Sequence, residues 1–169
     1  MNQFTDIPLT DLRELSLRSF TQFLLNDYYP FFYNSINRLG EQIRQAVIEP
    51  ELEILDGAQL KVYEEFDELY RKEKLVLFPF LLGLEESGDK SENCVPFKNV
   101  KLHYTAMTKL LLKITETLGN CFITQQNEGI VRGIQETANE LYNRMKQIQD
   151  IKEQHFYKNL KNCGLCKKI

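Results

Sequence analysis

The sequence predicts an all-α protein, an antiparallel up-down-up-down four-helix bundle with a short extra N-terminal helix. Two observations carry this prediction: apolar residues recur at helical spacing along most of the chain, and only 8 Gly and 5 Pro interrupt its 169 residues. A chain of this length suits one domain, which buries roughly 70% of its unfolded surface. We expect one domain over 1–169, with bundle helices at about 28–49, 57–84, 97–118 and 127–160 and a tail at 161–169.

The extra N-terminal helix is expected at about residues 9–25, where it would pack across one end of the bundle. Its apolar residues are Leu12, Leu15, Leu17, Phe20, Phe23 and Leu24. Asn26 and Asp27 divide it from the next segment, with Asp27 as an N-cap and Pro30 in the first turn, where a missing N–H is tolerated. A new helix is therefore predicted to start at Tyr28.

Each bundle helix carries one stripe of inward-facing residues at steps of three and four. The first, ended by Pro50, contains Tyr29, Phe32, Ile36, Leu39, Ile43 and Ala46. The second, kinked or ended by Pro79, contains Val62, Phe66, Leu69, Glu73, Val76 and Phe80. The third, closed by Gly119 as a C-cap, contains Val100, His103, Met107, Leu110 and Ile114. The fourth contains Ile134, Ala138, Leu141, Met145, Ile148, Lys152 and His155.

Polar residues within these stripes are the informative ones, because functional sites in helix bundles are built from inward-facing side chains. Glu73, His103, Lys152 and His155 are such residues. Only two histidines occur, and we find no phosphate-binding glycine loop and no nucleophile elbow, which disfavours an enzyme.

Charge and composition narrow the class of partner. The net charge of −3 disfavours a nucleic-acid partner. Basic residues are concentrated only in the tail, at Lys158, Lys161, Lys167 and Lys168. No segment is apolar enough for a membrane span, and the acidic N-terminal region is unlike a secretory signal. We therefore expect a cytoplasmic protein with no membrane partner and with reduced cysteines.

Three stretches together resemble one known family. They are Asn26-Asp27-Tyr28-Tyr29, then Leu69-Tyr70-Arg71-Lys72-Glu73-Lys74-Leu75-Val76-Leu77-Phe78-Pro79, and His103-Tyr104-Thr105-Ala106-Met107 followed by Leu110-Leu111. In order and spacing they resemble the hemerythrin-like family that includes the proteins for repair of iron centres. The resemblance extends over most of residues 10–160 and implies a four-helix bundle around a di-iron site.

Carried over position by position, this resemblance implies that most iron ligands are replaced. Glu73 stands at the bridging carboxylate and His103 at the third-helix histidine, whereas Tyr29 and Leu69 stand where the family has histidines. On the last helix, Ile148 and Lys152 align with a histidine and a glutamate. A slip of one residue would put Gln149 and Glu153 there instead. Under either register the histidine is absent.

We therefore expect a divergent member of the family that has lost the di-iron site, has no cofactor and acts as a non-enzymatic binding or regulatory protein. In this hypothesis Glu73, His103, Lys152 and Tyr29 form a polar network in the core. The alternative is an altered iron site of Glu73 and His103 with Tyr29 or His155, serving oxygen, nitric-oxide or redox-stress chemistry or iron-sulfur repair.

The partner is expected to be a small ligand, held in a core cavity left by the missing irons, or another protein. Cys163 and Cys166 form one C-x-x-C pair in the tail, which is typical of exposed thiols, and with a second chain it would complete a zinc site in a dimer. The protein is thus expected to be a monomer or a homodimer.

Overall fold

The computed structural model describes residues 9–46, 53–88, 95–120 and 128–157, which are helical almost throughout and contain no strand. The all-α class predicted from the sequence is confirmed. In chain order the elements are α1 (Leu9–Glu14), α2 (Leu17–Phe23), the π-helical turn η2 (Leu24–Tyr28), α3 (Tyr29–Ala46), α4 (Glu53–Lys72), the π-helical turn η4 (Glu73–Leu77), α5 (Phe78–Ser87), α6 (Val95–Asn120) and α7 (Glu128–Tyr157).

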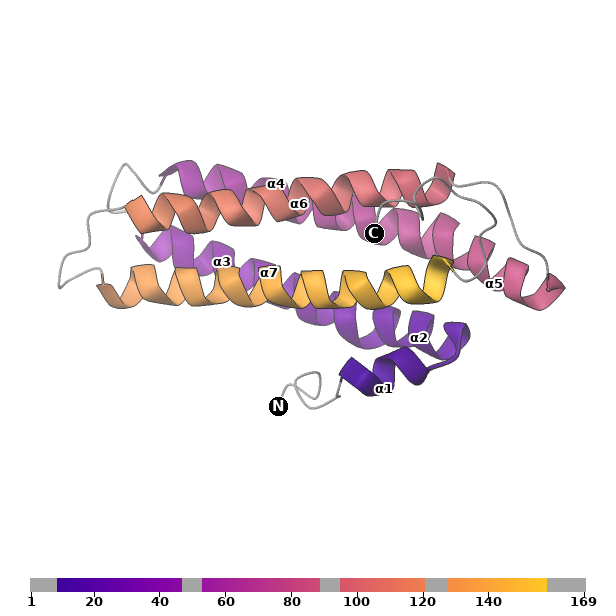
Figure 1. The fold of residues 1–169 in the computed structure, drawn as a ribbon. Helices are drawn as coiled ribbons and strands as arrows, with labels where there is room; N and C mark the ends of the chain where they lie inside the picture. The colour runs from indigo at the N-terminus through magenta and orange to yellow at the C-terminus, as the bar shows by residue number, and fades with distance from the viewer. Residues whose placement is uncertain (1–8, 47–52, 89–94, 121–127, 158–169) are drawn as a thin grey trace.

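The long helices lie side by side around a shared apolar core (Figure 1). Helix α4 packs against α6, α6 against α7, α7 against α3, and α3 against α4. The N-terminal helices lie on the outside of this group, where α1 contacts α7 and α2 contacts α5. None of the helices in the described ranges has an apolar stretch that would cross a membrane.

The predicted helix boundary at Asn26 and Asp27 is wrong. The break lies earlier, at Leu15 and Ser16, where the Ser16 hydroxyl caps α2 by accepting from the Ser19 backbone N–H at 3.1 Å. From Leu17 the helix continues through η2 into α3. Asp27 therefore lies inside a helix instead of capping one.

The π-helical turn η2 explains why this helix passes through Pro30. The Tyr29 N–H donates to the carbonyl of Leu24, five residues back, directly before the proline. A proline in a regular α-helix has no N–H and its ring clashes with the carbonyl four residues earlier. A π turn is wider than an α turn and holds one more residue, so it relieves that clash.

The second π-helical turn, η4, repeats this arrangement before Pro79. The Phe78 N–H donates to the carbonyl of Glu73, and α5 then continues to Ser87. Pro79 therefore does not end the helix, which stops at Gly88, whose positive φ of 70° favours glycine.

The extra residue in η4 changes which side chains face the core beyond Glu73. The sequence stripe predicted Val76 and Phe80, but Val76 is 51% exposed and Phe80 is half-buried. Leu77 and Leu81 are the buried residues instead. An uninterrupted α-helix would have kept the predicted spacing, so the correction follows from the π turn.

The stripes on α3 and α7 are buried as predicted at every position that was named for them. On α6, Val100, Met107 and Ile114 are buried, whereas His103 and Leu110 are half-buried and Leu111 takes a core position. The ends of the predicted helices at 47–49 and 158–160, and the tail at 161–169, lie outside the described residues.

Candidate functional site

Tyr29, Glu73 and Lys152 meet in the core although they come from three separate helical elements. Tyr29 begins α3, Glu73 begins η4 and Lys152 lies on α7, and each is at most 2% exposed. Lys152 Nζ donates to Glu73 Oε2 at 2.7 Å and to Tyr29 Oη at 3.3 Å. Tyr29 Oη donates a short hydrogen bond to the same Oε2. These three side chains form a closed hydrogen-bonded triangle, which we call the core cluster.

The two π-helical turns place two members of the core cluster. Tyr29 directly follows η2, and Glu73 is the first residue of η4. A π turn adds one residue to the helix, so it decides which of the neighbouring side chains point inward. Such turns occur often at functional sites. Lys152 lies on α7, which is one regular α-helix from Glu128 to Tyr157, so the ordinary helical spacing directs its side chain inward.

Aromatic rings surround the buried ammonium of the core cluster. Lys152 Nζ lies 5.2 Å from the ring centroids of both Tyr28 and Tyr29, within the range of cation–π attraction. The Tyr28 and Tyr29 rings meet edge to face at 5.3 Å, and Tyr70 packs against Tyr29 at 4.8 Å. These rings exclude water from the ammonium and offer it their negative faces.

Burial dominates the electrostatics of the core cluster. It raises the pKa of the Glu73 carboxyl above its ordinary value of 4.5, while the charge and hydrogen bond of Lys152 oppose that rise. Burial also raises the pKa of Tyr28, against the charge of Lys152 and together with that of Glu73. Lys152 is thus the group that favours the ionised form of Glu73.

The second carboxylate oxygen, Glu73 Oε1, is buried and has no hydrogen-bond partner among the described residues. Glu73 lines a narrow cavity between η4, α6 and α7, with Gln149 and Glu153 of α7 also on its wall. Its volume of about 10 Å³ is close to the minimum for one water molecule. This cavity is too small to hold an organic molecule as the small ligand that we expected in the core.

The donor set around Glu73 does not fit an iron centre. The Lys152 ammonium lies beside Glu73 Oε2 and would repel a metal cation. Leu69 and Ile148, which stand where the family resemblance places histidines, are buried and offer no donor atom. Within the described ranges, no three His, Cys, Asp or Glu side chains are grouped so that they could hold a metal.

His103 does not belong to the core cluster, so its predicted place in the polar network of Glu73, Lys152 and Tyr29 is corrected. It is half-buried between α4 and α6, where Nδ1 is 2.6 Å from Glu65 Oε2 and Nε2 contacts Lys72 Nζ. Glu65 and Lys72 lie two turns apart on α4, so the rotation of α6 directs the ring toward that helix and away from Glu73. His103 therefore links α4 to α6.

His155, the other predicted metal ligand, ties the N-terminal helices to α7. Its Nε2 lies 2.9 Å from the carbonyl oxygen of Leu12, and its ring stacks on Phe20 with centroids 4.3 Å apart. The hydrogen bonds described for Glu73 come from Tyr29 and Lys152. Cys163 and Cys166 lie outside the described residues.

Lys152 and Ile148 are the core-facing residues of α7, and Gln149 and Glu153 lie half-buried beside them. The helical spacing of the last predicted stripe, which contained Ile148 and Lys152, is confirmed here. Sequence reasoning missed Tyr28, whose buried ring borders the ammonium, because its position was taken as a helix start. The signal was the aromatic pair Tyr28-Tyr29 before a proline.

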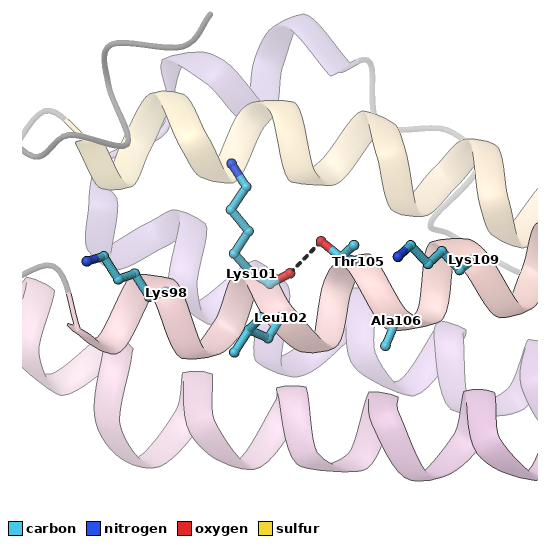
Figure 2. Close-up of a pocket in the computed structure, with 6 residues that line it drawn as sticks. All are labelled: Lys98, Lys101, Leu102, Thr105, Ala106 and Lys109. Carbon is cyan, nitrogen blue, oxygen red and sulfur yellow. Dashed lines mark hydrogen bonds between the residues drawn. The ribbon is translucent and has the colours of Figure 1, made fainter.

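A second hollow lies on the outer surface of α6, away from the core cluster (Figure 2). Its described lining residues all belong to this helix and comprise Lys98, Lys101, Leu102, Thr105, Ala106 and Lys109. These lysines are separated by uncharged residues in the sequence and share one face only on the folded helix, so they were not recognised as a basic concentration.

No protein-family model, curated protein or solved structure matches this chain.

Proposed function

We propose that this protein is a metal-free, hemerythrin-like antiparallel four-helix bundle that acts as a non-enzymatic binding or regulatory protein. The observation that carries the proposal is the Lys152 ammonium, 2.7 Å from Glu73 Oε2 in the core. Glu73 aligns with the carboxylate that bridges the irons in the resembling family. A lysine at that carboxylate supplies internally the positive charge that a metal would otherwise bring.

The remaining contacts of Glu73 support a structural role for the core cluster. Tyr29 donates to the same oxygen, and aromatic rings cover the ammonium, so the pair is enclosed and largely satisfied. The adjoining cavity of about 10 Å³ has no room for an organic substrate. Binding is therefore expected to involve the outer surface of the helices.

Metal analysis of the full chain tests this proposal. The protein is expressed in iron-supplemented cells, purified without chelator or metal-affinity resin, and measured by mass spectrometry and visible absorption. We expect less than about 0.1 iron per chain, no absorption band and a melting temperature unchanged by chelator, since chelation lowers the melting temperature only where it removes a metal that stabilises the folded state.

Two variants make the result specific to the core cluster. Lys152→Met removes the internal cation, and Lys146→Met, at an exposed position of the same helix, is the matched control. We expect Lys152→Met alone to lower the melting temperature. Near-stoichiometric iron in the wild type that is released by chelator with a fall in melting temperature would overturn the proposal, and would make Glu73 and Tyr29 the first ligands to replace.

A further inference from the structure

The outer face of α6 combines an exposed apolar side chain with positive charge. Leu102 is 69% exposed and lies between Lys98, Lys101 and Lys109 along the helix (Figure 2). The open hollow that these residues line has a volume of about 700 Å³. Single exposed apolar side chains are common on protein surfaces. Leu102 differs in that it lines a hollow together with three lysines, so this face combines apolar contact with positive charge.

The charge of this face is of one sign. Residues 95–115 contain four lysines, at 98, 101, 109 and 113, and no aspartate or glutamate, although the whole chain has a net charge of −3. None of these lysines forms an ion pair with another residue of the described ranges. By contrast, Arg38, Arg71 and Arg132 all pair with carboxylates on other faces.

Carboxylates of the two neighbouring helices lie at the flanks of α6. Glu65 of α4 contacts His103, on the side of α6 that faces α4. Glu153 of α7 lines the narrow cavity beside Glu73 together with Lys101, at the flank of α6 that faces α7. Lys98 and Lys109 thus have no ion-pair partner among the described residues, and opposite charge on a partner protein would complement them.

We propose that the outer face of α6 is a docking site for an acidic amphipathic helix of a partner protein. An apolar side chain of that helix covers Leu102, and its carboxylates pair with Lys98 and Lys109. From Lys98 to Lys109 the surface is about 16 Å long at 1.5 Å per residue, which matches three turns of a docked helix. The proposal does not depend on whether the core cluster has replaced a metal.

The chemistry of the face favours a peptide over other acidic partners. Nucleic-acid-binding domains are usually strongly basic as a whole, whereas this chain has a net charge of −3. Membrane-binding helices present a broad apolar face, whereas one leucine is the large apolar residue here.

Titration of the full-length protein with a synthetic helical peptide tests the proposal. The peptide has about four turns, leucines along one face and glutamates elsewhere. A second peptide carries lysines in place of the glutamates. Binding is measured by fluorescence anisotropy at several salt concentrations and mapped by amide NMR. We expect saturable binding of the acidic peptide alone, weaker at high salt, with shifts concentrated at residues 98–109.

Matched charge reversals locate the site on the protein. Lys98→Glu/Lys109→Glu should weaken binding by at least about tenfold, because attraction at both ends becomes repulsion. Lys61→Glu/Lys146→Glu makes the same change in net charge at exposed positions on α4 and α7 and should change Kd by less than about twofold. Leu102→Ala should weaken binding without altering the salt dependence, and circular dichroism verifies the fold of each variant.

Several results would overturn the proposal. They are equal binding of the lysine peptide, shifts that map outside α6, equal losses in the two charge-reversal pairs, or no binding at millimolar peptide. Two further measurements accompany the peptide titration. They are sedimentation of the protein with phosphatidylcholine–phosphatidylserine vesicles and light scattering of the protein alone. Vesicle binding without peptide binding would assign the face to a membrane surface. Self-association abolished by Lys98→Glu/Lys109→Glu would assign it to a second copy of the chain.

Discussion

Lys152 Nζ lies 2.7 Å from Glu73 Oε2, with both side chains at most 3% exposed. Removing two charges from water costs several kcal/mol per ion, and mutual attraction offsets that cost only when the pair is close and well hydrogen-bonded. Tyr29 supplies the additional hydrogen bonds. The stability of this protein should therefore depend on the two charges being present together or absent together.

Removing one partner should be far more costly than removing the whole cluster. Glu73→Leu and Lys152→Met are each expected to destabilise the fold by about 3–5 kcal/mol, because each leaves a buried charge unpaired. The triple variant Tyr29→Phe/Glu73→Leu/Lys152→Met should lie within about 2 kcal/mol of the wild type. Urea unfolding gives these values, and strictly additive losses would contradict the described coupling.

The raised pKa of Glu73 makes a prediction about pH. Between the unfolded value near 4.5 and the higher folded value, the folded state binds more protons, so stability falls as pH rises. Glu73→Gln cannot titrate at this position. The free energy of unfolding of the wild type minus that of Glu73→Gln should therefore decrease above pH 4.5 and level off above the folded pKa. A difference that increases with pH would mean that the pKa is lowered.

The change of register at η4 predicts unequal effects at adjacent positions. Val76→Ala should cost less than about 0.5 kcal/mol because Val76 is 51% exposed. Leu77→Ala should cost about 2–5 kcal/mol because Leu77 is 1% exposed and its loss leaves a cavity. Chemical unfolding of the two variants compares them directly. If Val76→Ala were the more destabilising of the two, Val76 would be the buried residue, as the regular helical spacing predicted.

Gly40 on α3 lies against the buried side chain of Gln59 on α4. A Cβ at residue 40 would be 2.8 Å from the Gln59 amide, which donates to the Ile36 carbonyl at 3.1 Å. Gly40→Ala should therefore destabilise the wild type by about 1 kcal/mol, since it displaces this hydrogen bond. In a Gln59→Ala background the same change should stabilise by up to about 1 kcal/mol, through helix propensity alone. Thermal unfolding of the four proteins completes the double-mutant cycle. A change in stability of the same sign for Gly40→Ala in both backgrounds would contradict the contact between residue 40 and Gln59.

The sequence by itself determined the helical class, the buried faces of α3 and α7, and the inward direction of Tyr29, Glu73 and Lys152. In an uninterrupted helix the spacing of side chains fixes which face is buried, so reading the spacing was sufficient there. The single-domain organisation and the family resemblance stay predictions.

Only the tertiary structure decided the rest. The π-helical turns depend on backbone hydrogen bonds, which side-chain spacing does not reveal, so the continuous helix through Asp27 and the burial of Leu77 could not be predicted. The partners of His103 depend on how α6 is rotated against α4. Whether Lys98 and Lys109 find an ion-pair partner among the described residues depends on the placement of the neighbouring helices. These are relations between helices, and the spacing along one helix does not contain them.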